Sequence, residues 1–224
     1  MNLPNGFTAA SCAAGLKSSG ALDLTLVVNN GPKFDAAAVY TSNQVVAAPV
    51  IWSKQVTKEK IVRAAILNSG GANACTGPQG FADTHRTAEH VGEVLGISSG
   101  EVVVCSTGLI GELLPMEKVI SGIDLIAKEL HQNALEEVAR AIMTTDSVAK
   151  IAHFKSEKFE VSGVAKGAGM LAPALATMLS VVMTDAILPQ EAQEIFQQVC
   201  DRTYNRIDSD GCTSTNDTVL LMGS

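Results

Sequence analysis

The stretch VAKGAGMLAPALATMLSVVMTDA, residues 164–186, joins two apolar segments through a loop rich in glycine and alanine. The flanking segments, residues 159–164 and 178–183, are short and contain several valines, which is typical of buried strands. We therefore predict two strands. The small-residue segment 163–176 between them is expected to be an active-site loop and not a linker between domains.

Further apolar runs and helical patterns alternate along the chain. Strands are also predicted at residues 23–28, 36–40, 61–67, 101–105 and 218–222. Helices are predicted to begin at Pro115, at Asn133 with Glu136 as its capping partner, and at Pro189, and a weaker helical pattern covers residues 78–95. This mixture of strands and helices predicts an α/β or α+β fold.

The final apolar run, DTVLLMGS at residues 217–224, is followed by no element that could cover it. An apolar strand with nothing packed against it is prone to aggregation. We therefore expect the natural protein to continue beyond Ser224.

Composition narrows the class of protein. The 224 residues carry a formal net charge of −7 with no Lys/Arg cluster, so a small polar ligand is a better expectation than nucleic acid. The five cysteines are scattered, and neither they nor the four histidines have metal-site spacing, so we expect free thiols and no metal. The chain shows no signal-peptide pattern and no apolar stretch of membrane-spanning length, which predicts a cytoplasmic protein.

The pair Ala176-Thr177 stands where the small-residue loop meets the second strand. A threonine hydroxyl needs an adjacent base, and its own α-amine can serve once the preceding peptide bond has been cut. The same hydroxyl can make that cut by attacking the Ala176 carbonyl, after which water hydrolyses the ester. An alanine-threonine pair is also an ordinary way to begin a strand, so both interpretations stay open.

Three other segments follow predicted elements. CSTGLIG, residues 105–111, could expose a hydroxyl and a backbone N–H that hold an oxyanion, or could be an ordinary turn. NSGGANACTGPQG, residues 68–80, could contact a substrate or only let backbones approach closely. MTTDS, residues 143–147, could bind an amino-acid carboxylate or cap a turn. Lys166 precedes the nearby glycines, which argues against a nucleotide-binding P-loop.

Taken together, these segments resemble the ornithine acetyltransferase family, the bifunctional glutamate N-acetyltransferases of arginine biosynthesis. The resemblance runs nearly end to end, in the family's order. It is carried by GFTAASCAAGLKSSGALDLTLVV, NSGGANACTG, STGLIGELLPM, AIMTTD, KGAGMLAPALATML and RTYNRIDSDGCTSTNDTVLLM. It implies a mixed α/β sandwich, shared with certain self-processing aminopeptidases.

The resemblance also implies roles for single residues. It places self-cleavage between Ala176 and Thr177, and makes Thr177 both the nucleophile and a substrate contact. Residues 1–176 would then be an α chain, and residues 177–224 the incomplete start of a β chain. The Thr107 hydroxyl and the Gly108 N–H would stabilise the oxyanion. Thr144 and Lys166 would contact the substrate.

The implied reaction moves an acetyl group from N-acetylornithine to glutamate through an ester on Thr177, in a heterotetramer of α and β chains. It needs no metal or organic cofactor, although acetyl-CoA could be a second acetyl donor. The family's remaining active-site positions, a glutamate and an Asn/Thr pair, would fall beyond Ser224. Two alternatives therefore stay open, a self-processing aminopeptidase and a truncated, non-catalytic fragment.

Overall fold

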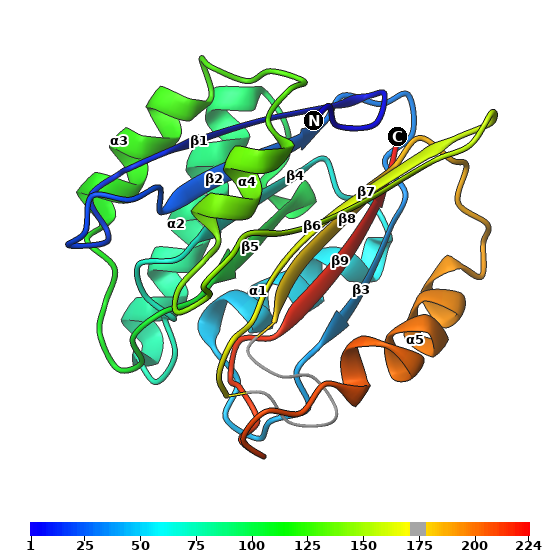
Figure 1. The fold of residues 1–224 in the computed structure, drawn as a ribbon. Coiled ribbons are helices and arrows are strands. Elements are labelled where there is room, and N and C mark those ends of the chain that lie inside the picture. The colour runs from blue at the N-terminus through cyan, green and yellow to red at the C-terminus, as the bar shows by residue number, and fades with distance from the viewer. Residues whose placement is uncertain (171–177) are drawn as a thin grey trace.

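The structure is a computed structural model that describes residues 1–170 and 178–224. Two β-sheets pack face to face, and helices cover their outer faces (Figure 1). The four-stranded sheet has the order β1-β2-β4-β5, with strands at Phe7–Cys12, Leu24–Asn29, Ala64–Asn68 and Val102–Ser106. Its neighbours pair antiparallel except for β4 and β5, which are parallel.

The second sheet has five strands in the order β3-β9-β8-β7-β6. In that order the strands are Ala36–Tyr40, Thr218–Gly223, Leu179–Thr184, Glu160–Lys166 and Lys150–Lys155. Only β8 and β9 pair parallel. The strand that comes last in the chain therefore lies inside the sheet, between β3 and β8.

The largest apolar core lies between the two sheets. It joins side chains such as Val27 and Leu67 of the four-stranded sheet to Val181 and Leu220 of the five-stranded sheet. Helix α4 (Leu135–Ala141) contributes its apolar face to the same core. Because each sheet buries its inner face against the other, this core fixes how the edges of the two sheets are aligned.

Helices complete the outer layers. Helices α2 (Gly77–Leu95) and α3 (Met116–Ile126) share a second core with the outer face of the four-stranded sheet. Helix α5 (Ala192–Arg202) covers β3 and β9 with Phe196 and Cys200 (Figure 1).

Helix α1 (Ala48–Val56) packs beside β5, where the Ser53 hydroxyl donates to the Val104 carbonyl at 2.8 Å. Short 3-10 turns occur at Thr57–Glu59, Ser99–Glu101 and Tyr204–Arg206.

All the predicted strands are present, with ends shifted by a few residues at most. The sequence patterns missed β1, β6 and α1. Every residue of β6 is at least partly exposed, so the strand lacks the alternation of apolar and polar residues that a half-buried strand shows. The loop predicted at residues 163–176 also begins later than expected, because β7 continues to Lys166.

The predicted start of α4 was wrong. The helix begins at Leu135, and Ala134 occupies the N-cap position without a side-chain hydrogen bond. Asn133 Oδ1 instead accepts a hydrogen bond from the N-terminal ammonium group at 3.1 Å. Glu136 accepts one from Arg140, one helical turn further on, at 2.6 Å. A competing partner for each side chain has therefore replaced the expected capping box.

The helix expected from Pro189 begins at Ala192. On this helix, Ile195 and Val199 are about half exposed, at 49% and 47%. The buried residues of α5 are Phe196 and Cys200, which pack on the sheet.

The expectation that the final strand has nothing to cover it was also wrong. Strand β9 pairs with β3 on one side and β8 on the other. Val219 and Leu220 are fully buried, on opposite faces of the sheet. The strand is covered by α5 on one face and by the sandwich core on the other, so its burial does not depend on an additional element.

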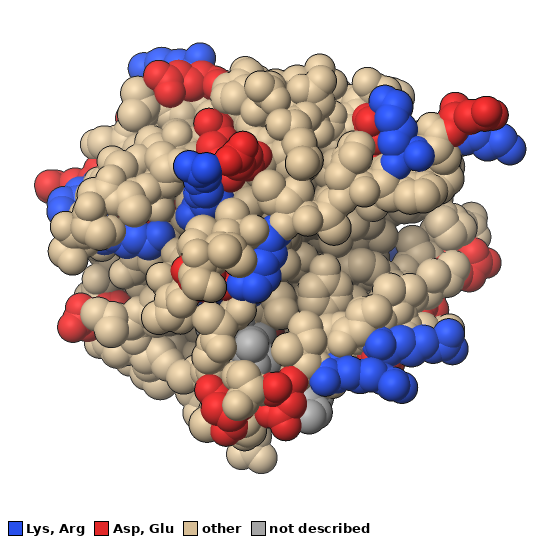
Figure 2. Space-filling model, viewed as in Figure 1, with Lys and Arg blue, Asp and Glu red and all other residues tan. Residues whose placement is uncertain are grey.

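Within residues 1–170 and 178–224, no helix is long and apolar enough to cross a membrane. The same residues contain no group of three or more His, Cys, Asp or Glu side chains placed to hold a metal ion. All five cysteines are free. On the face in Figure 2, basic and acidic side chains are interspersed and form no extended basic patch, which fits the net charge of −7.

Candidate active site

Strand ends from both sheets meet at one edge of the sandwich. In the four-stranded sheet, parallel pairing places Asn68 at the end of β4 opposite Ser106 at the end of β5. In the five-stranded sheet, Lys166 at the end of β7 pairs with Leu179, which pairs with Thr218 at the start of β9. The polar segments that flank these strands therefore converge on one place.

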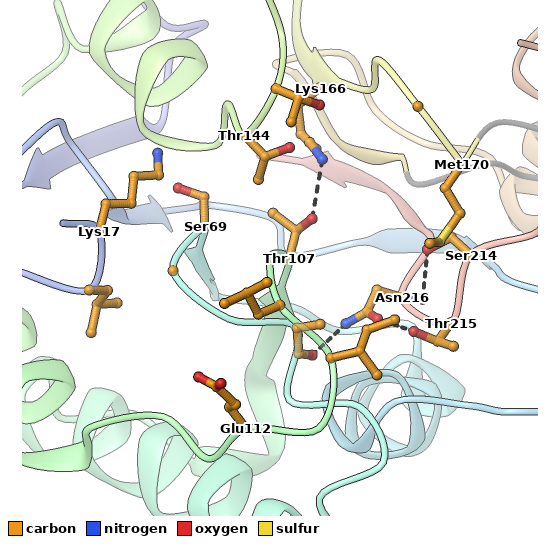
Figure 3. Close-up of a pocket in the computed structure, with 18 of the residues that line it drawn as sticks. Lys17, Ser69, Thr107, Glu112, Thr144, Lys166, Met170, Ser214, Thr215 and Asn216 are labelled. Carbon is orange, nitrogen blue, oxygen red and sulfur yellow. Dashed lines mark hydrogen bonds between the residues drawn. The ribbon is translucent and has the colours of Figure 1, made fainter. Parts of the chain in front are cut away.

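A cavity of about 850 Å³ opens at this edge, a size that suits a small-molecule ligand. All four segments singled out in the sequence contribute to its wall. The lining residues are Leu16, Lys17, Ser18, Ser19, Ser69, Gly70, Ala72, Thr107, Gly108, Leu109, Ile110, Glu112, Thr144, Thr145, Lys166, Gly169, Met170, Ser214, Thr215 and Asn216 (Figure 3).

Four of the predicted site residues lie together in this wall: Thr107, Gly108, Thr144 and Lys166. The predicted cleavage site and nucleophile, Ala176 and Thr177, lie outside the described residues. Met178, the first described residue after them, is buried immediately before β8.

Lys166 and Thr107 point toward each other from the two sheets (Figure 3). The Lys166 Nζ donates to the Thr107 Oγ1 at 3.2 Å, and the two residues are only 1% and 2% exposed. Because the Thr107 oxygen accepts this bond, its own proton remains to be donated elsewhere. A hydroxyl fixed in this way at a cavity wall is suited to stabilise negative charge that develops on an acyl group.

The charge on Lys166 is tuned by its surroundings. Burial lowers the pKa of Lys166 to about 8, and the carboxylates of Asp146 and Asp217 oppose that shift. The ammonium form therefore still predominates near neutral pH. A positive charge held in a water-poor wall acts more strongly on a nearby oxyanion than the same charge would in water.

Gly108 allows two backbone segments to approach closely. Its φ is +134°, and a Cβ atom there would lie 2.8 Å from the Gly71 nitrogen and 3.0 Å from the Gly70 carbonyl carbon. Thr107 forms an isolated β-bridge with Gly71 at the same place. Glycine at residue 108 therefore lets the segment after β5 lie directly against the segment after β4.

Asp146 anchors the wall around Thr144. Its carboxylate accepts the N–H of Thr144 at 3.2 Å and that of Gly167 at 2.8 Å, and it pairs with the Lys150 ammonium. Burial alone would raise the pKa of Asp146, but the Lys150 bond and the two N–H bonds outweigh it and hold the pKa below its ordinary value. One carboxylate thereby joins the backbone at Thr144 to the backbone at Gly167, the residue that follows Lys166.

Sequence reasoning missed the N-terminal part of the wall. Asp23 is fully buried and accepts backbone N–H groups from Ala14, Leu16 and Lys17. These bonds shape the loop that brings Lys17 to the cavity, where its Nζ donates to the Met143 carbonyl at 2.7 Å. Burial lowers the pKa of Lys17, and Asp23 partly opposes the shift. An aspartate six residues after a lysine is too weak a pattern to have indicated this.

Asn216 joins the two sheets at the floor of the site and was also missed. Its Nδ2 donates to the carbonyl of Ala72 at 2.5 Å and to that of Ser106 at 2.9 Å. The Thr215 hydroxyl donates to its Oδ1. Ser214 and Asn216 belong to a polar run directly before an apolar strand. That pattern was present in the sequence, but we predicted no site role for it.

Comparison with known proteins identifies the family. A sequence profile described as the ArgJ family matches residues 8–224. This chain belongs to the ArgJ family. An arginine biosynthesis bifunctional protein ArgJ from Streptomyces coelicolor is 58% identical over 98% of the chain. The resemblance seen in the sequence is thereby confirmed. The chain spans 57% of the length of that relative.

Solved structures confirm the sandwich fold for this ArgJ-family chain. An ornithine acetyltransferase from Mycobacterium tuberculosis, solved in complex with ornithine, matches 79% of the chain and 94% of its own, with a TM-score of 0.69 and 48% identity. An L-aminopeptidase D-Ala-esterase/amidase from Ochrobactrum anthropi aligns with 98% of this chain. The alignment covers 72% of the aminopeptidase chain and has a TM-score of 0.58. At 11% identity, that second likeness concerns the fold alone.

Proposed function

We propose that this chain carries the acyl-transfer site of an ornithine acetyltransferase in arginine biosynthesis. The observation that carries the proposal is the convergence of Thr107, Gly108, Thr144 and Lys166 on one cavity in a chain of the ArgJ family. The M. tuberculosis relative is named for this activity and was solved with ornithine, which supports an ornithine-type substrate here.

The proposed site forms by self-cleavage. Thr177 attacks the Ala176 carbonyl, and hydrolysis of the ester leaves an α chain of residues 1–176 and a β segment that begins at residue 177. The new α-amine of Thr177 then serves as the base that activates its hydroxyl. The α and β chains stay together and assemble as a heterotetramer.

In the transfer reaction, the Thr177 hydroxyl attacks the acetyl carbonyl of N-acetylornithine. The Thr107 hydroxyl and the Gly108 N–H stabilise the oxyanion, and Lys166 supplies positive charge behind Thr107. Ornithine leaves with a proton, and acetyl remains on Thr177 as an ester. Glutamate attacks that ester and departs as N-acetylglutamate. Thr144 and Lys166 help to position the amino-acid substrates.

The test is an acetyl-transfer assay combined with intact mass measurement. Purified protein is incubated with N-acetylornithine, with and without glutamate, and released ornithine and N-acetylglutamate are quantified. We expect glutamate-dependent turnover and two fragments that meet at residues 176 and 177. A further sample with acetyl-CoA and glutamate tests the second acetyl donor that the word bifunctional in the relatives' names suggests.

Thr177→Ala is the matched control, because it removes the hydroxyl that both steps need. We expect that variant to stay uncut and to release no ornithine. Release of N-terminal residues from small peptides would instead favour the aminopeptidase alternative. A chain that folds but neither cleaves nor transfers would favour the non-catalytic fragment.

A further inference from the structure

The cavity wall contains two ammonium groups that no carboxylate neutralises. Lys17 and Lys166 both line the cavity, and in the part of the chain that the structure describes neither forms an ion pair with a carboxylate. The two charges also repel each other. Burial is the largest cause of the lowered pKa of Lys166, and the charge on Lys17 lowers that pKa further. A cavity with two unpaired positive charges in its wall favours an anionic ligand.

The Lys17 ammonium is held in place and retains an unused donor. Its Nζ donates to the Leu22 carbonyl at 2.9 Å and to the Met143 carbonyl at 2.7 Å. An ammonium group has three N–H donors, and the third has no acceptor among the described residues. The nearby Asp23 does not provide one, because its oxygens accept backbone N–H groups of the same loop. Lys17 can therefore bind a ligand without giving up either of its present bonds.

The groups around Lys17 suit a carboxylate. The Met143 carbonyl that accepts from Lys17 directly precedes Thr144, whose side chain lines the same cavity. Figure 3 shows Lys17 and Thr144 in one region of the wall, on the far side of the view from Asn216. A carboxylate bound in this region meets an ammonium group and a hydroxyl. Hydrogen bonds from a charged donor to a carboxylate are about twice as strong as those between neutral groups.

We infer that Lys17 binds the α-carboxylate of the amino-acid substrate. The inference rests on the proposed function, in which N-acetylornithine and glutamate, each with an α-carboxylate, use one cavity in turn. Lys166 is the poorer candidate for this contact, because it is 1% exposed and already donates to Thr107. A carboxylate bound at Thr107 would add a second negative charge where the reaction itself creates one. Lys17 therefore holds the permanent charge of the substrate, and Lys166 stabilises the charge that develops during transfer.

The covalent structure of the substrate requires two separate positive groups in one cavity. In N-acetylornithine, only the α-nitrogen and the α-carbon lie between the acetyl carbonyl carbon and the carboxylate carbon. Standard bond lengths place those two carbons roughly 3–4 Å apart. The cation that binds the carboxylate must therefore lie near the oxyanion groups without coinciding with them. Lys17 meets this condition, because it lines the same cavity and its charge acts on Lys166.

A purely structural role for Lys17 makes a different prediction. The Met143 carbonyl lies just beyond the C-terminal end of α4, where a cation can stabilise a helix. Loss of that effect would weaken every ligand of the cavity alike. The test therefore compares two ligands, ornithine and ornithinamide, in which an uncharged amide replaces the carboxylate. Calorimetry gives the dissociation constant of each ligand for each protein variant.

Lys17→Met removes the ammonium group, and Lys118→Met is the matched control. The Lys118 Nζ donates to the Gly15 carbonyl at 2.8 Å and so holds the same loop from outside the cavity. We expect wild type and Lys118→Met to bind ornithine about 10- to 100-fold more tightly than ornithinamide, the range of a hydrogen bond to a charged group. In Lys17→Met that preference should shrink to less than about threefold, because only ornithine binding weakens. In the transfer assay, Lys17→Met should raise KM for N-acetylornithine and for glutamate and leave kcat nearly unchanged.

A measurement on wild type covers the case in which Lys17→Met does not fold. The chain is treated with an amine-acylating reagent in the presence of either ligand, and the modified lysines are mapped by mass spectrometry. We expect ornithine to slow the acylation of Lys17 more than ornithinamide does. Lys118 in the same digest corrects for reagent that the ligand amines consume. Equal protection of Lys17 by the two ligands overturns the inference.

The outcomes distinguish this inference from the proposed function. An unchanged preference for ornithine in Lys17→Met, or equal weakening of both ligands, overturns the role of Lys17, and continued acetyl transfer then leaves the proposed function standing. Wild type that binds neither ligand, or binds both equally, also overturns it. A preference that depends on Lys17 in a chain that transfers no acetyl group supports the carboxylate contact and contradicts the proposed function.

Discussion

The β6–β7 hairpin holds lysines in opposite surroundings at its two ends. At one end, Lys155 pairs with Glu160 at 2.8 Å, and its side chain is 70% exposed. At the other end, Lys166 is 1% exposed and donates to Thr107 across the sandwich. Glu160 raises the pKa of Lys155, whereas burial lowers that of Lys166.

The difference shows that a lysine's neighbours, and not its position on a strand, determine what its charge does. Water screens the Lys155 pair, and ordering two long side chains costs entropy, so such pairs contribute little. The Lys166 charge lies in a water-poor wall, where the cost of burying it is high and its effect on a nearby oxyanion is large. We therefore expect Lys166 to matter for chemistry more than for stability.

The largest expected effect is that of Lys166→Met. Methionine has a similar length and no charge, so it removes the positive end and the bond to Thr107 while filling the space. We expect the rate of ornithine release to fall about 100-fold, the usual cost of losing one oxyanion-stabilising group. Unfolding by urea should show unchanged or higher stability, because the lowered pKa of Lys166 means that its charge is less favourable in the folded chain than in the unfolded chain. A parallel loss of stability and rate would instead make Lys166 a structural residue.

A smaller effect tests the contact between the two strand ends. Gly108→Ala places a Cβ atom 2.8 Å from the Gly71 nitrogen at a positive φ. Gly111→Ala also faces a positive φ, +89°, but its Cβ meets nothing within 4 Å. Both substitutions impose the strain of a positive φ on alanine. The difference between their free energies of unfolding therefore measures the steric clash at residue 108. We expect Gly108→Ala to lower the free energy of unfolding by about 2 kcal/mol more than Gly111→Ala, measured with urea. Equal losses would mean that the neighbouring segment can shift.

These contrasts also explain what the sequence could predict. The segments after β5 and around Lys166 were recognisable because small residues and hydroxyls follow apolar runs, and strand ends of one sheet meet at an edge. The pairing of strands across the two sheets depends on tertiary packing. Asn216 and Asp217 acquire their contacts only when β9 inserts between β3 and β8. In the sequence they are ordinary polar residues before a strand.

The same limit applies to exposure. The Lys155 and Lys166 positions both follow apolar residues in predicted or actual strands, and their sequence surroundings do not separate the exposed one from the buried one. Exposed β6 was missed for a related reason, because a strand that buries little shows no apolar alternation. Patterns of residues therefore indicated the segments that line the cavity, but they could not predict which charges there are buried.

A third contrast concerns the pH dependence of stability. Because burial raises the folded pKa of Asp217 to about 7, the folded chain binds more protons than the unfolded chain between about pH 4 and 7. The contribution of Asp217 to the free energy of unfolding is therefore present at low pH and is lost as the pH rises through 7. We expect the stability of wild type relative to Asp217→Asn to fall by about 1–2 kcal/mol between pH 5.5 and 7. Urea unfolding at the two pH values measures this difference, and a rise with pH would contradict the assignment.

The smallest expected effect completes the comparison of the two lysines. Lys155→Met is the same substitution as Lys166→Met, and it removes the ammonium group that pairs with Glu160. Because the side chain is largely exposed, water replaces the lost partner, and we expect neither the urea midpoint nor the rate of ornithine release to change measurably. Added salt should change the urea midpoints of wild type and Lys155→Met by the same amount, because the exposed Lys155–Glu160 pair is too weak for its screening to be measured. A loss of transfer in Lys155→Met would mean that the hairpin tip is coupled to the cavity along β7, and the contrast between the two ends would then fail.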